Sequence, residues 1–148
     1  MEFLDYTWIL TSKDLVESNQ TLRSLSFRAD THGNLNATWF LKLYPKGHEG
    51  AEEGFCPIYL MCEETNIYPL EVSYFFTLTN RNAPENIVAK DTNVFEAGRG
   101  WGTQKLIELP RVLNPENGFL QRGRIYIKTE LSYTLQKQTK WPVRPTAT

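Results

Sequence analysis

The strongest constraint on the fold is a ten-residue segment near the C-terminal end in which side chains alternate in character. Between Arg124 and Tyr133, every second residue is apolar or a threonine, and the residues between are mostly charged or polar. A period of two places one set on a buried face and the other set toward solvent. Residues 124–133 are therefore predicted to form a strand of an antiparallel sheet with one wet face.

The same period recurs along the chain, separated by turn-forming Gly, Pro and Asn residues. Further strands are expected at residues 5–11, 22–28, 38–44, 58–63, 70–79, 93–95 and 104–107. The one helical candidate is a turn at residues 109–113. Seven or eight short strands with so little helix favour an all-β antiparallel sandwich or barrel over an α/β fold.

Charge and length exclude several classes of protein. The chain has 148 residues, with 16 Lys and Arg against 17 Asp and Glu, which fits one domain without a broad basic surface. The longest uncharged apolar-rich run, residues 55–62, is far shorter than the roughly 20 residues of a membrane helix. Glu2 and Asp5 make the N-terminus unlike a signal peptide. We expect a cytoplasmic or nuclear protein with no nucleic-acid partner and no membrane partner.

The residues that usually carry catalysis or metal binding show no matching pattern. The two histidines, His32 and His48, stand in loops without a partner at ligand spacing, and no Gly-x-Ser-x-Gly motif occurs. Cys56 and Cys62 lie in one expected strand, on the same face but too far apart to bridge. We predict that both are reduced core thiols, and that the chain is not an enzyme and uses no metal or cofactor.

Aromatic residues are abundant, with 4 Trp, 7 Tyr and 8 Phe making 13% of the chain, and such residues either fill β-cores or anchor binding sites. The segment Gly98-Arg99-Gly100-Trp101-Gly102 has the composition of a binding hot spot, because glycines leave the indole accessible beside an arginine. The alternative is a core tryptophan among bulge glycines.

Several segments resemble the MATH (meprin and TRAF homology) domain. Residues 39–47, WFLKLYPKG, resemble its W-x-L-x-x-x-P-K-G strand and turn, residues 74–80 its F-x-F-x-L-x-N strand, and residues 95–102 its F-x-x-G-x-x-W-G signature. Weaker matches in the same order are residues 6–9, 58–60, 106–107 and 118–120. The resemblance covers residues 3–135, and residues 136–148 are interpreted as a tail or linker. The pattern is most similar to that of MATH-BTB adaptors such as speckle-type POZ protein.

This resemblance implies an eight-stranded antiparallel TRAF-like β-sandwich with one short helical turn. It also implies a protein-interaction module that binds extended peptide motifs, as the substrate-recognition domain of a cullin-RING E3 ubiquitin ligase adaptor. The implied partners are substrate proteins with short linear motifs, and a cullin ligase bound through a BTB domain absent from this chain. The full-length protein would then be a dimer.

The resemblance also implies a peptide groove. Tyr59, Phe95, Trp101 and Gly102 match groove residues of the family, and Tyr74 stands in place of a phenylalanine. At other positions the sequence departs from the family, because Arg99 replaces a lysine, Gly100 an acid, Thr103 an aromatic residue and Gln104 a lysine, while Asn93 falls near a tyrosine. The predicted peptide-binding residues are Tyr59, Tyr74, Asn93, Phe95, Arg99, Gly100, Trp101, Gly102 and Thr103.

Other interpretations remain open from the sequence. Tyr74 has the parity of Phe76 and Leu78, so alternation alone assigns it to the core. A TRAF-type adaptor that binds receptor tails as a trimer would have the same fold. So would a MATH module attached to a deubiquitinase or an extracellular peptidase. A carbohydrate-binding sandwich would also use exposed Trp and Tyr side chains.

Overall fold

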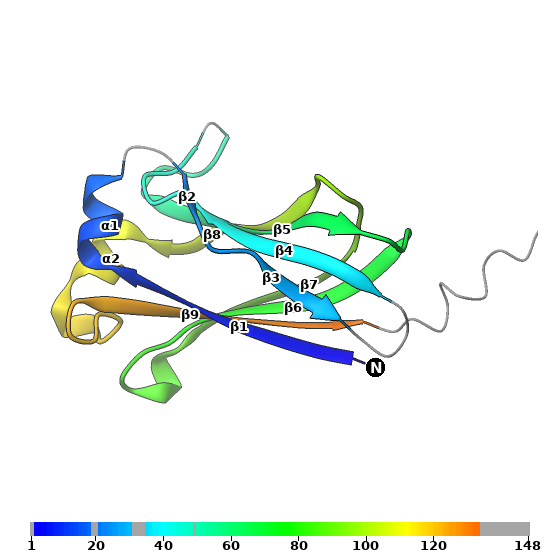
Figure 1. Ribbon diagram of the computed structural model, residues 1–148. Coiled ribbons are helices and arrows are strands. Elements are labelled where there is room, and N and C mark those ends of the chain that lie inside the picture. Colours follow the sequence, from blue (N-terminus) through cyan, green and yellow to red (C-terminus); the bar gives the residue numbers. More distant parts are fainter. Residues whose placement is uncertain (1, 19–20, 31–34, 49, 134–148) are drawn as a thin grey trace, which may run out of the picture.

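Two antiparallel sheets pack face to face in the computed structural model, which describes residues 2–18, 21–30, 35–48 and 50–133 (Figure 1). The side chains between the two layers form one continuous apolar core. The expected all-β antiparallel sandwich is therefore confirmed. The predicted tail at 136–148 lies outside the described residues.

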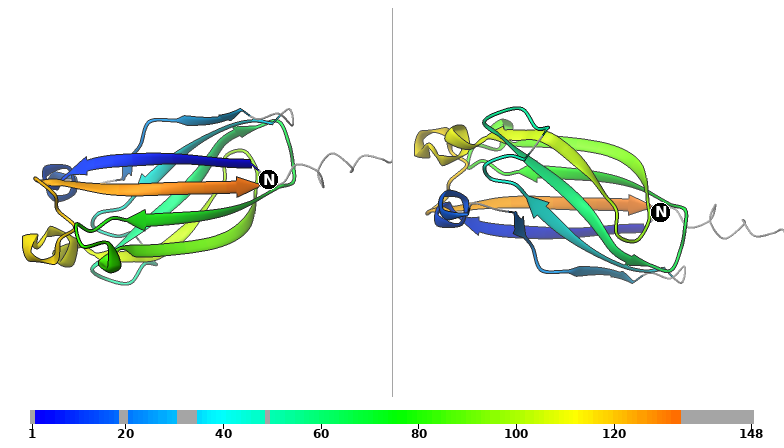
Figure 2. Two further views of the ribbon diagram at one scale, coloured as in Figure 1. Left: turned by 90° about the horizontal axis from the view of Figure 1, so that it is seen from below. Right: turned by 90° about the horizontal axis from the view of Figure 1, so that it is seen from above.

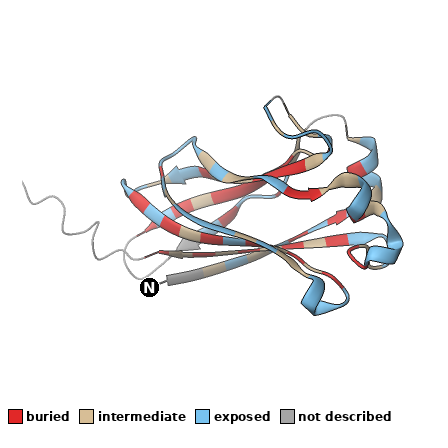
Figure 3. Cartoon of the chain, turned by 180° about the vertical axis from the view of Figure 1, so that it is seen from behind, coloured by how far each residue is buried: buried red, intermediate tan, exposed pale blue. Residues whose placement is uncertain are grey.

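The first sheet has the strand order β1-β9-β6-β7 (Figure 2, left). Its strands are β1 (Glu2–Thr11), β9 (Arg124–Tyr133), β6 (Leu70–Leu78) and β7 (Ile87–Phe95). The alternation that predicted β9 is confirmed, because every second side chain from Ile125 to Tyr133 is buried. Along β6 and β9, red and tan or blue segments alternate in the same way (Figure 3). The expected strand at 93–95 was too short, since β7 begins at Ile87.

The second sheet has the order β2-β4-β5-β8, with β3 also paired to β4 (Figure 2, right). Its strands are β2 (Leu22–Arg23), β3 (Phe27–Asp30), β4 (Asn36–Leu43), β5 (Phe55–Thr65) and β8 (Gly100–Glu108). β2 and β3 are two pieces of one edge, so the described part of the chain contains the eight strands expected when they are counted together.

Short helices gather at one end of the sandwich (Figure 1). The predicted turn is α2 (Leu109–Leu113), and two 3-10 turns are η1 (Ala83–Glu85) and η2 (Pro115–Asn117). The expectation of a single helical turn was incomplete, because α1 (Ser12–Glu17) follows β1. A capping box starts it: the Asp14 N–H donates to Thr11 Oγ1 at 3.0 Å, and Asp14 Oδ2 accepts from the Thr11 N–H at 2.9 Å.

Both cysteines are buried in β5, and neither forms a disulfide. Burial raises the pKa of the Cys56 thiol to about 12 and that of the Cys62 thiol to about 11. Such thiols are protonated and unreactive at neutral pH, as expected of core residues. No helix in the described ranges combines the length and the apolar character that a membrane crossing requires.

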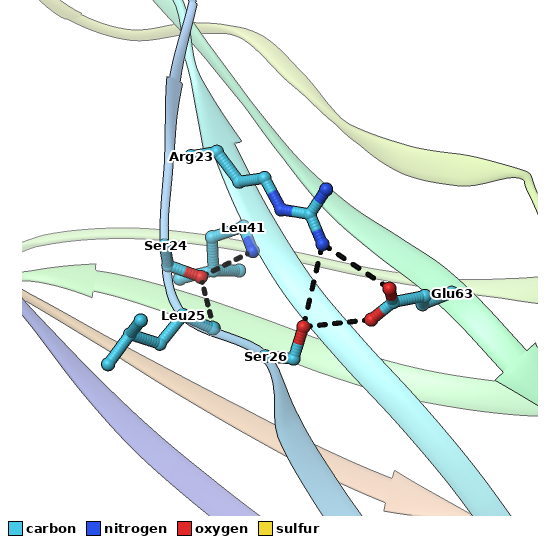
Figure 4. A network of polar contacts seen from close by, with 6 residues as sticks. All are labelled: Arg23, Ser24, Leu25, Ser26, Leu41 and Glu63. Atoms are coloured by element: carbon cyan, nitrogen blue, oxygen red, sulfur yellow. Dashed lines mark hydrogen bonds and ion pairs between the residues drawn. The ribbon is translucent and has the colours of Figure 1, made fainter.

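The edge formed by β2 and β3 is held to the rest of its sheet by side chains (Figure 4). The Ser24 hydroxyl accepts from the Leu41 N–H and donates to the Leu25 carbonyl, each at 2.8 Å, in the break between the two strands. The Arg23 guanidinium lies 3.7 Å from the centre of the Phe40 ring and also contacts Glu63. This cover explains why Phe40 is buried although it faces away from the core.

The same edge is closed toward the first sheet by two stacked rings. Tyr6 of β1 lies on Phe27 of β3, with 4.4 Å between the ring centres and 9° between their planes. The opposite edge of the sandwich, between β7 and β8, has a different construction.

Candidate functional site

The chain passes from one sheet to the other between β7 and β8, through a turn at residues 96–99. The Gly98 N–H donates to the Cys62 carbonyl at 2.8 Å, and the Cys62 N–H donates to the Arg99 carbonyl at 2.9 Å. These bonds fix the turn to the end of β5. As a result, the outer edge of the first sheet, β7, faces the outer edge of the second sheet, β8.

A cavity of about 230 Å³ lies in this gap and opens to solvent. It is lined by Tyr74, Phe76, Ala89, Lys90, Asp91, Gly102 and Thr103. β6 and β7 supply one wall and β8 supplies the other. Pockets that enclose drug-sized ligands are about 300–1,000 Å³, so this one has room for a single side chain of a longer ligand.

Tyr74 combines the two roles that the sequence left open. Its side chain is 1% exposed and its ring packs edge-on against Phe76 and Phe95, with 5.5 and 5.8 Å between ring centres. The hydroxyl donates to Asn93 Oδ1 at 2.6 Å. Burial, and then the negative charge of Asp91, raise the pKa of Tyr74 to about 12. The ring belongs to the core, and the residue also forms part of the cavity wall.

Phe95 lies beneath the site rather than on its surface. The side chain has no exposed area, and its ring meets Trp39 edge-on at 5.2 Å. Phe95 has no surface to offer a ligand, so its contribution here is to support the Tyr74 ring from below.

Trp101 is the most exposed of the predicted groove aromatics. The residue is 45% exposed, yet its indole Nε1–H donates to the Val94 carbonyl of β7 at 3.0 Å. The side chain therefore bridges the two sheets at the rim of the gap. A core tryptophan would not be this exposed. A large aromatic ring held in place at the surface is instead typical of a binding anchor.

Tyr59 belongs to β5, next to β8, and its side chain lies on the outer face of the second sheet, away from the cavity. Its hydroxyl and His48 Nε2 are 2.8 Å apart, and the two rings stack with centres 5.8 Å apart. Burial and then Tyr44 raise the pKa of Tyr59, while a hydrogen bond with Gln104 lowers it. Tyr59 is thus not a wall of the cavity.

Gly102 separates Tyr59 from the cavity. It is paired with Tyr59 in the sheet register, and it also lines the cavity. A Cβ atom at Gly102 would overlap the carbonyl oxygen of Ile58, so only glycine allows β8 to lie this close to β5.

The remaining predicted residues lie at different places along β8 and its turn. Arg99 is 69% exposed and forms an ion pair with Glu96, with 3.3 Å between Nε and Oε1. Gly100 is paired with Met61 of β5. Thr103 lines the cavity, and its hydroxyl accepts from the Lys105 N–H at 3.2 Å. The cavity therefore brings Tyr74, Gly102 and Thr103 together, with Trp101 beside them and Asn93 bound to Tyr74, while Tyr59 and Arg99 lie outside it.

Sequence reasoning missed Asp91, Lys90 and Ala89, because only the last three residues of β7 were expected to be a strand. The inner positions of this strand include Asp91 and Asn93, and polar residues there hide the period of two. His48 was also missed as a partner of Tyr59, and no sequence signal identifies that contact.

The free edge of β7 presents backbone groups toward the gap. The Val94 carbonyl points this way, since it accepts from Trp101, and alternate residues of a strand direct their backbone groups to the same side. Lys90 and Thr92 share this orientation, and the Thr92 N–H is already bonded to Asp91 Oδ1 at 2.8 Å. Such an edge can pair with an extended peptide. In the described residues, no three His, Cys, Asp or Glu side chains gather to hold a metal ion.

Comparisons with known proteins agree with this geometry. A family model described as the MATH domain matches residues 5–131. Among solved structures, TRAF5 from Notothenia coriiceps superimposes with a TM-score of 0.64 over 88% of this chain and 73% of that one. The sequence identity is 11%, so this likeness shows a shared TRAF-like fold.

Proposed function

This chain belongs to the MATH domain family of protein-interaction modules, and we propose that it binds an extended peptide segment of a partner protein at the edge between β7 and β8. The peptide would lie beside the free backbone edge of β7 and place side chains against Trp101 and into the cavity. The role is one of capture, without a chemical step.

The observation that carries this proposal is the position of Trp101. An indole that is 45% exposed costs free energy in water, and its hydrogen bond to Val94 holds it at the mouth of the gap instead of letting it fold away. A rigid aromatic ring beside a cavity and an unpaired strand edge supports peptide recognition better than it supports a purely structural role.

The finer proposal is that this domain recognises substrates for a cullin-RING E3 ubiquitin ligase in the cytoplasm or nucleus. The resemblance of residues 39–47 and 95–102 to MATH-BTB adaptors supports it. A BTB domain elsewhere in the full-length protein would then supply the ligase contact and a dimer.

Selection from a library of random 12-residue peptides displayed on phage tests the binding function. Peptides that bind this domain should lose about thirtyfold or more in affinity to Trp101→Ala, because truncation of an anchoring aromatic removes a hot spot. Leu25→Ala, an 80% exposed apolar residue near the opposite edge, is the matched control and should bind as the wild type does. Thermal unfolding of both variants should stay within a few degrees of the wild type. Binding that survives Trp101→Ala would overturn the proposal.

A TRAF-type adaptor for receptor tails is the second candidate, since it uses the same sandwich. A MATH module joined to a deubiquitinase or peptidase is a third. The mass of the full-length protein in solution separates the first two, because a BTB adaptor predicts a dimer and a TRAF-type adaptor predicts a trimer.

A further inference from the structure

Asp91 is an exposed acidic residue in the wall of the cavity. It lies on the inner face of β7, directly opposite Tyr74 in the register, where the neighbouring strand has buried apolar residues. Its Oδ1 accepts the Thr92 N–H, which leaves Oδ2 available to a ligand. Among the described residues, no Lys, Arg or His forms an ion pair with Asp91.

The positive charges near the gap are engaged elsewhere. Lys90 also lines the cavity, but its ammonium lies toward the outer face of the sheet, 5.9 Å from the centre of the Phe75 ring. Arg99 is paired with Glu96, and Lys105 is paired with Glu52 at 3.1 Å. The wall of the cavity therefore carries a solvent-exposed carboxylate with no ion-pair partner among the described residues.

The polar groups around Asp91 favour a ligand that donates hydrogen bonds. The Tyr74 hydroxyl uses its proton on Asn93 and so presents its lone pairs. The Thr103 hydroxyl can also accept a further bond. A carboxylate with accepting hydroxyls around it matches an ammonium or guanidinium group, which only donates.

The rest of the cavity suits an aliphatic stem. Phe76 and Ala89 are paired in the register and give the wall an apolar part. Lysine and arginine side chains combine such a stem with a charged tip. A volume of about 230 Å³ is large enough for one side chain of this kind.

We propose that this cavity receives a lysine or arginine side chain of the bound peptide, and that Asp91 selects it. The inference rests on the proposed function, since it names the chemistry of a peptide bound at the same edge. It also specifies the register, because the basic residue must reach the cavity while a neighbouring residue of the peptide covers Trp101.

The test uses peptides selected from the same 12-residue library, synthesised with a fluorescent label. Each selected peptide is compared with a copy in which the basic residue is replaced by Gln. Wild-type protein should bind the Gln copy about tenfold more weakly, because a charge-assisted hydrogen bond is lost. Asp91→Asn keeps the oxygen that accepts from Thr92 and should bind both peptides with similar, weak affinity. Glu71→Gln, an exposed acid of β6 on the outer face, is the charge-matched control and should discriminate as the wild type does.

Two results would overturn the inference, and they differ from failure of the proposed function. Selected peptides that depend on Trp101 but contain no basic residue would support the proposed peptide-binding function and refute the role of Asp91. Equal discrimination by Asp91→Asn and wild type would do the same. If no selected peptide depends on Trp101, both the proposed function and this inference are wrong.

Discussion

The two lateral edges of this sandwich differ in how the space between the two sheets is filled. At the β1–β3 edge, Tyr6 and Phe27 stack face to face and close the gap between the sheets. At the β7–β8 edge, a cavity of about 230 Å³ remains and a half-exposed tryptophan bridges its rim. The closed edge stabilises the fold, and the open edge is available to a partner.

The difference originates in the inner-face residues of the two edge strands. In β1, this face carries Trp8 and Tyr6, which supply enough apolar surface to fill the space. In β7, the corresponding face carries Asp91, which is exposed, and Asn93, whose amide oxygen accepts from Tyr74, so neither supplies an apolar ring to fill the space. The groove therefore remains open because polar residues stand on the inner face of β7, where β1 has aromatic rings.

The largest expected effect is on the closed edge. Phe27→Ala should lower the free energy of unfolding by about 3 kcal/mol, because it removes a buried ring and leaves a void under Tyr6. Urea unfolding measures this loss, with Leu25→Ala as the control that should change little. Peptide binding by the folded fraction should remain. Loss of binding without loss of stability would show that the two edges are not separate in function.

Gly102→Ala should destabilise the open edge by about 2 kcal/mol, since the added methyl overlaps backbone that cannot move independently. Gly100→Ala is the comparison, because its methyl would chiefly meet the flexible Met61 side chain and should cost less. Urea unfolding of both variants ranks them. A milder effect at Gly102 than at Gly100 would contradict the close approach of β8 to β5.

Tyr74→Phe should cost about 1 kcal/mol by removing the hydrogen bond to Asn93. The raised pKa of Tyr74, about 12 against an ordinary 10, means that its contribution to stability is complete below pH 10 and is lost as the pH rises toward 12. The wild type should therefore lose more stability across this range than Tyr74→Phe does. Tyr68→Phe, at an exposed position, should follow the wild type. Parallel curves for wild type and Tyr74→Phe would refute the burial of this phenol.

The smallest expected effect is at the turn of the open edge. Arg99→Ala removes an exposed ion pair with Glu96, and such pairs contribute little in water. The free energy of unfolding should change by less than about 0.5 kcal/mol. Chemical denaturation measures this change, and Glu96→Gln provides the reciprocal control. A loss above 1 kcal/mol in either variant would show that the turn depends on this pair for its stability.

Much of the fold could be predicted from the sequence because most strands have one apolar face. β9 and β6 follow strict alternation, and the burial of their inner residues confirms it. α1 was missed because six residues give no helical period, although Thr11 and Asp14 form a recognisable capping box. Most of β7 was missed because polar residues occupy its inner face.

The candidate site was less accessible to prediction. Trp101 could be found because its flanking glycines and the family pattern both mark it. The cavity could not, since it depends on the spacing of β7 and β8 in space, and neither strand encodes that spacing alone. The burial of Phe95 and the position of Tyr59 on the outer face also follow from packing between elements distant in sequence.

Amide hydrogen exchange with and without a selected peptide tests the central claim most directly. Saturating peptide should slow exchange in β7 (Ile87–Phe95) and β8 (Gly100–Glu108), because the peptide pairs with a free edge and excludes water from the gap. Exchange in β1 and β3, at the closed edge, should not change. Protection confined to β1 and β3, or to the outer face of either sheet, would contradict the assignment of the open edge as the binding site.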